Sequence, residues 1–360
     1  MPQLSSRSVD ASPATRLRKG VLRLLFRLPE GVKRRIAGPA VRIDGRELAL
    51  DAQLLIALNK RQGTVRLVVG DSPDKTREAV RSHQHILAGP HYGTVIDRDI
   101  QIDTPDGEIL ATLHTPAGYP APSPLLVFFH GGGWVIGSRA EYAPLTRFLA
   151  HHAGVRVLSV DYRLAPEHPF PAPFNDALAA FEHAHAHAAE LGVDPQRIAV
   201  GGDSAGGNLA AAVSQAVMKR QGPRPSHQFL FYPATDLTRR YPSRERLANG
   251  FMLTDDDIKW FENHYAPASA DRSDPRLSPL LGEASPGIAA AHVFVAGFDP
   301  LRDEGEAYAT ALEKAGATVT LDRMDDLIHG YLNFYALGPR FRAAALRAAE
   351  AIRTHLSERN

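Results

Sequence analysis

Ser204 stands in the glycine-rich stretch GGDSAGG, where an apolar run gives way to a helical pattern. The preceding RIAV is typical of a buried strand, and the following NLAAAVS is typical of a helix. A G-x-S-x-G pattern at such a junction is typical of a nucleophile elbow, whose sharp turn leaves room only for glycine at positions 202 and 206 and exposes the hydroxyl. The alternative is an ordinary turn in which Ser204 or Asp203 caps the helix. The flanking strand and helix favour the elbow.

A serine hydroxyl needs a neighbouring base before it can attack a substrate, and the chain has 16 histidines from which to choose. His329 lies after the last predicted strand and before the last predicted helix. We therefore expect it at the same edge of the sheet as Ser204. His183 and His187 are four residues apart on a predicted helix and could bind a metal, but no further ligand lies near them in the sequence. We interpret them as a solvated helix face.

The base in turn needs a carboxylate that holds its ring and stabilises the imidazolium. The stretch VFVAGFDPLRDEG offers Asp299, Asp303 and Glu304. Asp299 directly follows a predicted strand and precedes a proline. Asp303 and Glu304 fall in the first turn of the next predicted helix, where the helix dipole stabilises acidic side chains. We therefore predict Asp299 as the acid, with Asp303 as the alternative.

Three consecutive glycines, Gly131–Gly133, follow the apolar run LLVFFH. Glycine frees the backbone to direct N–H groups at a developing oxyanion, and the amide of Ala205 could supply a further donor. A phosphate-binding loop is the alternative, but neither of its glycine patterns follows a strand here. We predict an oxyanion pocket formed by Gly131, Gly132, Gly133 and Ala205. We expect His130 to orient this loop rather than to act as a second base.

The elements that must position these residues begin at about residue 95, where short apolar runs alternate with helical patterns. The runs predict strands at 94–103, 108–116, 125–130, 156–162, 197–203, 229–233, 292–298 and 318–324, and the helical patterns lie near 140–152, 173–191, 205–219, 304–316 and 339–357. Strands that alternate with helices indicate an α/β fold, with a mostly parallel sheet covered on both faces.

Two regions lie outside this alternation. Residues 1–90 are helical and basic, and residues 238–290 carry one predicted helix at TDDDIKWFENHY. Both could lie over the carboxyl edge of the sheet, where such folds bind ligands. We expect residues 1–90 to form a helical cap, to which 238–290 contribute, and residues 91–360 to form the catalytic domain. The candidate substrate-binding residues are Trp134, Asp203 and Phe251, with Met252 and Trp260 as further candidate walls of the pocket.

Residues 1–35 carry nine Lys or Arg against two Asp or Glu. The apolar residues Leu17, Val21, Leu24, Leu25 and Leu28 follow helical spacing, and most of the basic residues fall on the other side. One interpretation is a membrane-surface or targeting helix, with residues 14–35 in contact with lipid. We favour the other, in which the apolar stripe packs on the rest of the protein.

Composition excludes several classes of function. The net charge of +1 gives no overall field to attract nucleic acid. The absence of cysteine excludes disulfides and cysteine-ligated metals, so nothing requires an oxidising compartment and we expect a cytoplasmic protein. No apolar run approaches the roughly 18 residues of a membrane span, so we expect no stable membrane insertion.

The motifs HGGGW, VDYRLAPEHPFPA, GGDSAGGNLAA, DPLRDEG and IHGY occur in this order. Over residues 95–355 the chain resembles the hormone-sensitive lipase-like branch of the α/β-hydrolases. The resemblance implies an eight-stranded, mostly parallel sheet with a helical cap, hydrolysis of short- to medium-chain carboxylic esters and often a homodimer. It maps the nucleophile, acid and base to Ser204, Asp299 and His329, and the oxyanion donors to glycines in 131–133 and to Ala205. Arg163 and Glu167 are implied to brace loops.

Together these features predict a serine carboxylesterase that acts on a small-molecule ester through an acyl-enzyme and needs neither metal nor cofactor. A non-catalytic small-molecule receptor is the alternative from another class. Within enzymes, the alternatives are a lipase for long acyl chains, an amidase and an acyltransferase.

Overall fold

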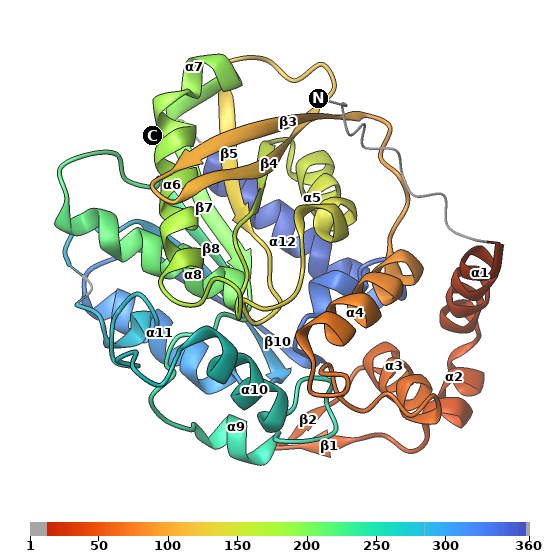
Figure 1. The fold of residues 1–360 in the computed structure, drawn as a ribbon. Helices are drawn as coiled ribbons and strands as arrows, with labels where there is room; N and C mark the ends of the chain where they lie inside the picture. The colour runs from red at the N-terminus through yellow and green to blue at the C-terminus, as the bar shows by residue number, and fades with distance from the viewer. Residues whose placement is uncertain (1–12, 284, 358–360) are drawn as a thin grey trace.

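The computed structural model describes residues 13–283 and 285–357, which form a central sheet with helices on both faces (Figure 1). The eight strands lie in the order β10-β9-β8-β7-β5-β6-β4-β3. Their bounds are β3 Val95–Thr104, β4 Gly107–Pro116, β5 Ser123–Phe129, β6 Arg156–Asp161, β7 Val193–Asp203, β8 His227–Phe231, β9 Ala290–Phe298 and β10 Val319–Ile328. Only the pairings β3–β4 and β4–β6 are antiparallel. The prediction of a mostly parallel, eight-stranded sheet is confirmed.

The central strand β5 explains why both faces of the sheet are covered. Every residue of β5 is buried, and its alternate side chains enter two different hydrophobic clusters. Leu125 and Val127 pack on the side of α6 (Ala172–Ala186), α8 (Ala205–Ala216) and α11 (Arg302–Lys314). Leu126 and Phe128 pack on the side of α5 (Arg139–Ala153) and α12 (Pro339–Ser357). A strand buried on both faces is typically a continuous apolar run, and residues 124–129 of β5 form one.

Two predicted helices differ in their extent. The helix predicted over 173–191 is divided at His187 into α6 and the short α7 (Ala188–Leu191), because the backbone of His187 leaves the helical region and its ring nitrogen also contacts the carbonyl of His183. The helix predicted over 205–219 ends at Ala216 and continues as a 3₁₀ turn, η1 (Val217–Lys219). Neither change moves a candidate site residue.

The N-terminal region contains α1 (Pro13–Arg27), α2 (Glu30–Ala37), a hairpin of β1 (Arg42–Ile43) and β2 (Arg46–Glu47), α3 (Leu50–Arg61) and α4 (Pro73–Leu87). The region 238–290 contains α9 (Pro242–Arg246), α10 (Asp255–Tyr265) and η2 (Pro279–Leu281). Sequence patterns predicted α10 but neither α9 nor the small hairpin. Of the described helices, none combines the length and the apolar character needed to cross a bilayer.

Asp257 of α10 joins these two regions. Its carboxylate accepts hydrogen bonds from the backbone N–H groups of Leu67 and Val68 and from the side chain of Arg66. Asp257 also completes the capping box at the start of α10 by accepting from Thr254. One buried carboxylate therefore holds the α3–α4 connection against α10.

Candidate active site

Ser204 lies on the turn between β7 and α8, with φ 54° and ψ −116°. A non-glycine residue with positive φ is strained, on the order of 1–3 kcal/mol, and persists where the surrounding structure enforces it. A Cβ at Gly206 would overlap the carbonyl oxygen of Phe129, and one at Gly202 would overlap the same oxygen and Gly206. The two glycines thus let the chain turn tightly beneath the serine, as the elbow interpretation requires.

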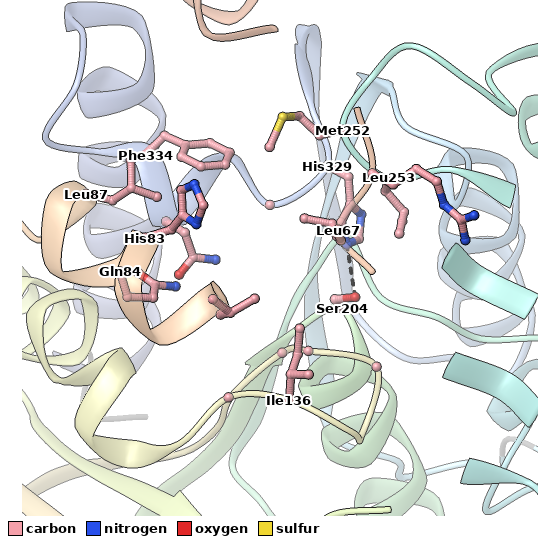
Figure 2. Close-up of a pocket in the computed structure, with 18 of the residues that line it drawn as sticks. Leu67, His83, Gln84, Leu87, Ile136, Ser204, Met252, Leu253, His329 and Phe334 are labelled. Carbon is pink, nitrogen blue, oxygen red and sulfur yellow. Dashed lines mark hydrogen bonds between the residues drawn. The ribbon is translucent and has the colours of Figure 1, made fainter. Parts of the chain in front are cut away.

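His329 directly follows β10 and lies beside Ser204 (Figure 2), with its Nε2 atom 3.0 Å from the serine Oγ. Its Nδ1 atom is 2.8 Å from Oδ2 of Asp299, which directly follows β9. An ionised carboxylate can only accept, so Nδ1 carries the proton and Nε2 is free to accept from the serine hydroxyl. The ends of three strands, β7, β9 and β10, bring these side chains together.

Asp299 is fully buried, and its second oxygen accepts the backbone N–H of Leu301 at 2.8 Å. The rival carboxylates lie elsewhere. Asp303 accepts hydrogen bonds from the backbone of Ser243 and the side chain of Arg302, and Glu304 accepts from the backbone of Thr235. Of the three acidic side chains in this stretch, only Asp299 contacts His329 among the described interactions.

The glycine loop after β5 presents backbone N–H groups near the serine. Gly132 has φ 118° and Gly133 has φ 58°, both in the region that favours glycine. The N–H groups of Gly132, Gly133 and Ala205 have no hydrogen-bond partner among the described residues. All three residues line the same cavity as Ser204. They are available to donate to a bound ligand.

Gly131 differs from the other glycines, and this corrects the expectation that it supplies an oxyanion donor. Its N–H donates to Oδ1 of Asp203 at 2.7 Å, so the N–H is already occupied. Asp203, which was expected to bind substrate, also lines the cavity over Ser204. Its second oxygen accepts from the hydroxyl of Tyr142 at 3.1 Å and the amide of Asn333 at 3.3 Å. Asp203 therefore braces the loop.

The side chain of Asp203 is buried. Burial raises the pKa of this carboxyl to about 6, although the hydrogen bonds from Gly131 and Tyr142 and the nearby His329 act in the opposite direction. The group is thus ionised at neutral pH but becomes protonated in mildly acidic solution.

His130 orients the same loop, as expected from the sequence. Its side chain is fully buried, its Nδ1 atom contacts the carbonyl of Gly131 at 2.8 Å, and its ring stacks on Tyr162 with 4.3 Å between centroids. The hydroxyl of Tyr162 donates to the His130 carbonyl at 2.7 Å. Burial lowers the pKa of His130, so this ring is neutral at pH 7.

Arg77 of α4 is a positioning residue that sequence analysis missed. Its guanidinium donates to the carbonyls of Val135 and Ala165, each at 2.8 Å, and forms a two-point contact with the carboxylate of Glu167. Val135 belongs to the turn that follows the glycine loop, where its own N–H donates to Gly132. A single side chain from the N-terminal region thus ties this turn to the 162–168 segment. No sequence motif marks Arg77.

A cavity of about 800 Å³ lies over Ser204 and is lined mostly by apolar side chains. Ser204 and His329 face it from one side, with Leu67, Met252 and Leu253 nearby, while His83, Gln84, Leu87 and Phe334 lie across it (Figure 2).

Trp134 lines the cavity as expected. Phe251 and Trp260 do not. Phe251 packs on Phe298 with ring centroids 5.4 Å apart, and Trp260 packs on Phe261 and His264.

The possible metal site at His183 and His187 is not formed. The two rings stack on one another with centroids 4.1 Å apart. Among the residues that the structure describes, no group of three or more His, Asp or Glu side chains is arranged to hold a metal ion.

Comparisons with known proteins place this geometry in context. Residues 126–333 match a family model described as the alpha/beta hydrolase fold. The chain is 45% identical to the carboxylic ester hydrolase LipN of Mycobacterium tuberculosis, over 92% of this chain and 89% of that protein. It is 35% identical to an ethyl acetate hydrolase of Pseudomonas putida, over 84% and 96%.

Solved structures give the same result for the fold. An ester hydrolase from the metagenome of Lake Arreo, complexed with a derivative of bipyridine phosphonate, superposes with a TM-score of 0.81 at 37% identity, over 86% of this chain and all of that one. A thermostable esterase from Pseudomonas putida superposes with a TM-score of 0.82 at 32% identity, over 87% and 98%.

Proposed function

The chain belongs to the hormone-sensitive lipase-like branch of the α/β-hydrolase family, and we propose that it hydrolyses small carboxylic esters with Ser204 as nucleophile, His329 as base and Asp299 as acid. The observation that carries this assignment is the unbroken series of hydrogen bonds from Ser204 Oγ through His329 to Asp299. A strained serine that faces a cavity and contacts a carboxylate-bound histidine is equipped for acyl transfer.

The first step forms the acyl-enzyme. Ser204 Oγ attacks the ester carbonyl carbon while His329 Nε2 takes the serine proton. The tetrahedral intermediate then collapses. The bond from carbon to the alkoxy oxygen breaks, and the proton on Nε2 passes to the departing alcohol. In the second step His329 takes a proton from water, the resulting hydroxide attacks the acyl carbon, and Ser204 leaves with that proton. Asp299 stabilises the imidazolium in both steps.

The oxyanion of each intermediate is held by the N–H groups of Gly132, Gly133 and Ala205. Their lack of partners among the described residues supports this role, as does the start of α8 at Ala205, where the helix dipole favours negative charge. Gly131 is excluded from the donor set because Asp203 occupies its N–H.

The substrate class follows from the cavity. Its apolar lining suits an acyl or alkyl group of short to medium length, and the ethyl acetate hydrolase among the relatives acts on a small ester.

Residues 1–90 form the cap in this proposal, with 238–290 as a further part, because α1, α3, α4 and α10 all contribute to the lining. The cap therefore sets the length of acyl chain that fits.

The test combines a substrate panel with one active-site variant. We expect turnover of p-nitrophenyl esters to peak at roughly four to eight acyl carbons, and Ser204→Ala to abolish both the burst of p-nitrophenol and labelling by a serine-directed phosphonate. A folded Ser204→Ala protein with unchanged turnover would exclude Ser204. No labelling of the wild-type protein would favour a receptor, and activity that rises toward sixteen carbons would favour a lipase.

A cytoplasmic location and a homodimer complete the proposal. The first is supported by a chain without cysteine, and the second by the family resemblance alone. Cell fractionation and sedimentation velocity test them separately from catalysis.

A further inference from the structure

Helix α1 exposes an apolar stripe to solvent. Leu17, Val21 and Leu24 are 70%, 50% and 63% exposed, and their spacing of four and three residues places them on one side of the helix. The side that faces the protein carries the buried Phe26 and the partly buried Leu22. The sequence-based expectation that the whole stripe packs on the protein is therefore wrong for Leu17, Val21 and Leu24. Adjoining exposed leucines and valines mark an interaction surface.

Positive charges flank this stripe. α1 contains five basic residues and no acidic one, and Arg16, Arg18 and Arg27 are exposed. A second, smaller cavity of about 350 Å³ lies at the end of the helix and brings Arg23 and Arg27 together with Arg342 of α12. The chain as a whole carries a net charge of +1, so this concentration of positive charge is a local feature.

The stripe continues into the cavity over Ser204. Leu17 and Val21 line that cavity as well as being exposed. Val65 and Val69, in the connection between α3 and α4, likewise line the cavity and are exposed. The cavity therefore reaches the surface next to α1, with apolar side chains around its opening.

We propose that α1 docks on an anionic lipid surface, with Leu17, Val21 and Leu24 in the acyl boundary and the flanking arginines at the lipid phosphates. An exposed apolar stripe bordered by arginines is the pattern of a helix that lies in the membrane interface. A second copy of this chain is a poorer occupant. If two copies met through α1, the helix of each would bring three exposed arginines and no acidic residue to the contact.

Docking at this surface would bring the opening of the cavity to the membrane. An ester that partitions into lipid could then enter between α1 and Val65 without crossing water. This consequence rests on the proposed ester hydrolysis, whereas the docking itself does not.

Co-sedimentation with vesicles tests the docking. We expect the full chain to sediment with phosphatidylglycerol–phosphatidylcholine vesicles and much less with phosphatidylcholine alone. Leu24→Gln removes an exposed apolar side chain and should weaken vesicle binding roughly tenfold. Because Leu24 does not line the cavity, the same variant should leave turnover of p-nitrophenyl butyrate unchanged. The matched control is Ile96→Gln on β3, which changes a side chain of 61% exposure and should leave binding unchanged.

A second pair of variants tests the charges. Arg16→Gln with Arg27→Gln should weaken binding to the anionic vesicles and reduce its salt dependence. Arg220→Gln with Arg353→Gln removes the same charge from exposed residues elsewhere and should do neither. Equal loss in both pairs would show attraction by overall charge and overturn the proposal.

Three further outcomes decide the matter. No sedimentation of the wild-type protein with anionic vesicles would overturn the proposal. The proposal would also be overturned if sedimentation velocity detected a wild-type dimer that dissociates in Leu24→Gln, and if neither protein bound vesicles. If the protein binds vesicles as expected but hydrolyses no p-nitrophenyl ester, the docking stands and the proposed function fails.

Discussion

The N–H of Gly131 donates to the buried carboxylate of Asp203, which immediately precedes Ser204 in the chain. This bond of 2.7 Å joins the glycine loop after β5 to the nucleophile elbow after β7. The loop of the proposed oxyanion donors and the turn at Ser204 are thus held together by one shared contact, and a substitution at Asp203 should disturb both.

For Asp203→Asn, we expect a loss of turnover without a comparable change in KM. The amide replaces one carboxylate oxygen with a nitrogen that cannot accept from Gly131 or Tyr142, so the loop is held less firmly. A decrease of roughly 10- to 100-fold in kcat is expected. Steady-state kinetics on p-nitrophenyl butyrate measures it, and an unchanged kcat in a folded variant would refute the bracing role.

Replacing the acid of the proposed triad should be far more damaging than replacing its neighbour. Asp299→Asn leaves His329 without a carboxylate at Nδ1, and a decrease on the order of 10³–10⁴-fold in kcat is expected. Asp303→Asn is the matched control. It contacts Ser243 and Arg302 rather than His329 and should lose less than tenfold in kcat. The opposite ranking of the two variants would reassign the acid.

Arg77→Ala should slow catalysis from a distance. It removes both carbonyl contacts that hold the turn at Val135 and the 162–168 segment, and it leaves those carbonyls to water. We expect kcat to fall roughly tenfold and the free energy of unfolding by about 1–3 kcal/mol. Arg81→Ala, one helical turn away, removes one contact between an exposed arginine and Glu141 and no contact with a backbone carbonyl, and it serves as the control. Arg77→Ala would also release Glu167, whose pKa the Arg77 contact holds near 2.

Glu304 should contribute stability that is lost as the pH rises from about 4.5 to about 8. Burial raises the pKa of this carboxyl to about 8, so the folded chain retains a proton that the unfolded chain releases near its ordinary pKa of about 4.3. The stabilising contribution is fully present below the unfolded pKa and is lost as the pH rises through the folded one. The difference amounts to roughly 3–5 kcal/mol across that window.

Glu304→Gln should remove that part of the pH dependence and keep the bond from Thr235 through its amide oxygen. Urea unfolding at pH 5, 6.5 and 8 measures the free energy of unfolding of both proteins. The control is Glu306→Gln, which makes the same exchange on the outer side of the helix, where Glu306 contacts Arg323. A free energy of unfolding that changes with pH in the same way in Glu304→Gln as in the wild-type protein would contradict the raised pKa.

The glycine pattern and the order of motifs were enough to place Ser204, Asp299 and His329 at one edge of the sheet. This was possible because the carboxyl ends of parallel strands share an edge, and each residue lies after a predicted strand in the sequence. The choice of Asp299 over Asp303 could be made for the same reason. A loop after a strand lies at that edge, whereas the first turn of the next helix can point away from it.

The sequence could not separate Gly131 from Gly132 and Gly133, because the three glycines are alike in type and adjacent in the chain. Their N–H groups point in different directions, and only the position of Asp203 decides which of them is occupied. Arg77 was missed for a related reason. Its partners, Val135, Ala165 and Glu167, lie 58 to 90 residues away in the chain, and an arginine on an amphipathic helix carries no sign of such contacts.

The sequence alone determined the eight strands of the sheet and their alternation with helices, the elbow and the chemical types of the proposed triad, because these depend on local periodicity and on residues with special backbone conformations. Only the tertiary structure decided which apolar residues face the substrate. Trp134 lines the cavity while Phe251 is packed against Phe298, and Leu24 is left in solvent while Phe26 is buried. Hydrophobicity places a side chain away from water, but the packing of distant segments selects the surface that covers it, and that selection is a long-range property of the folded chain.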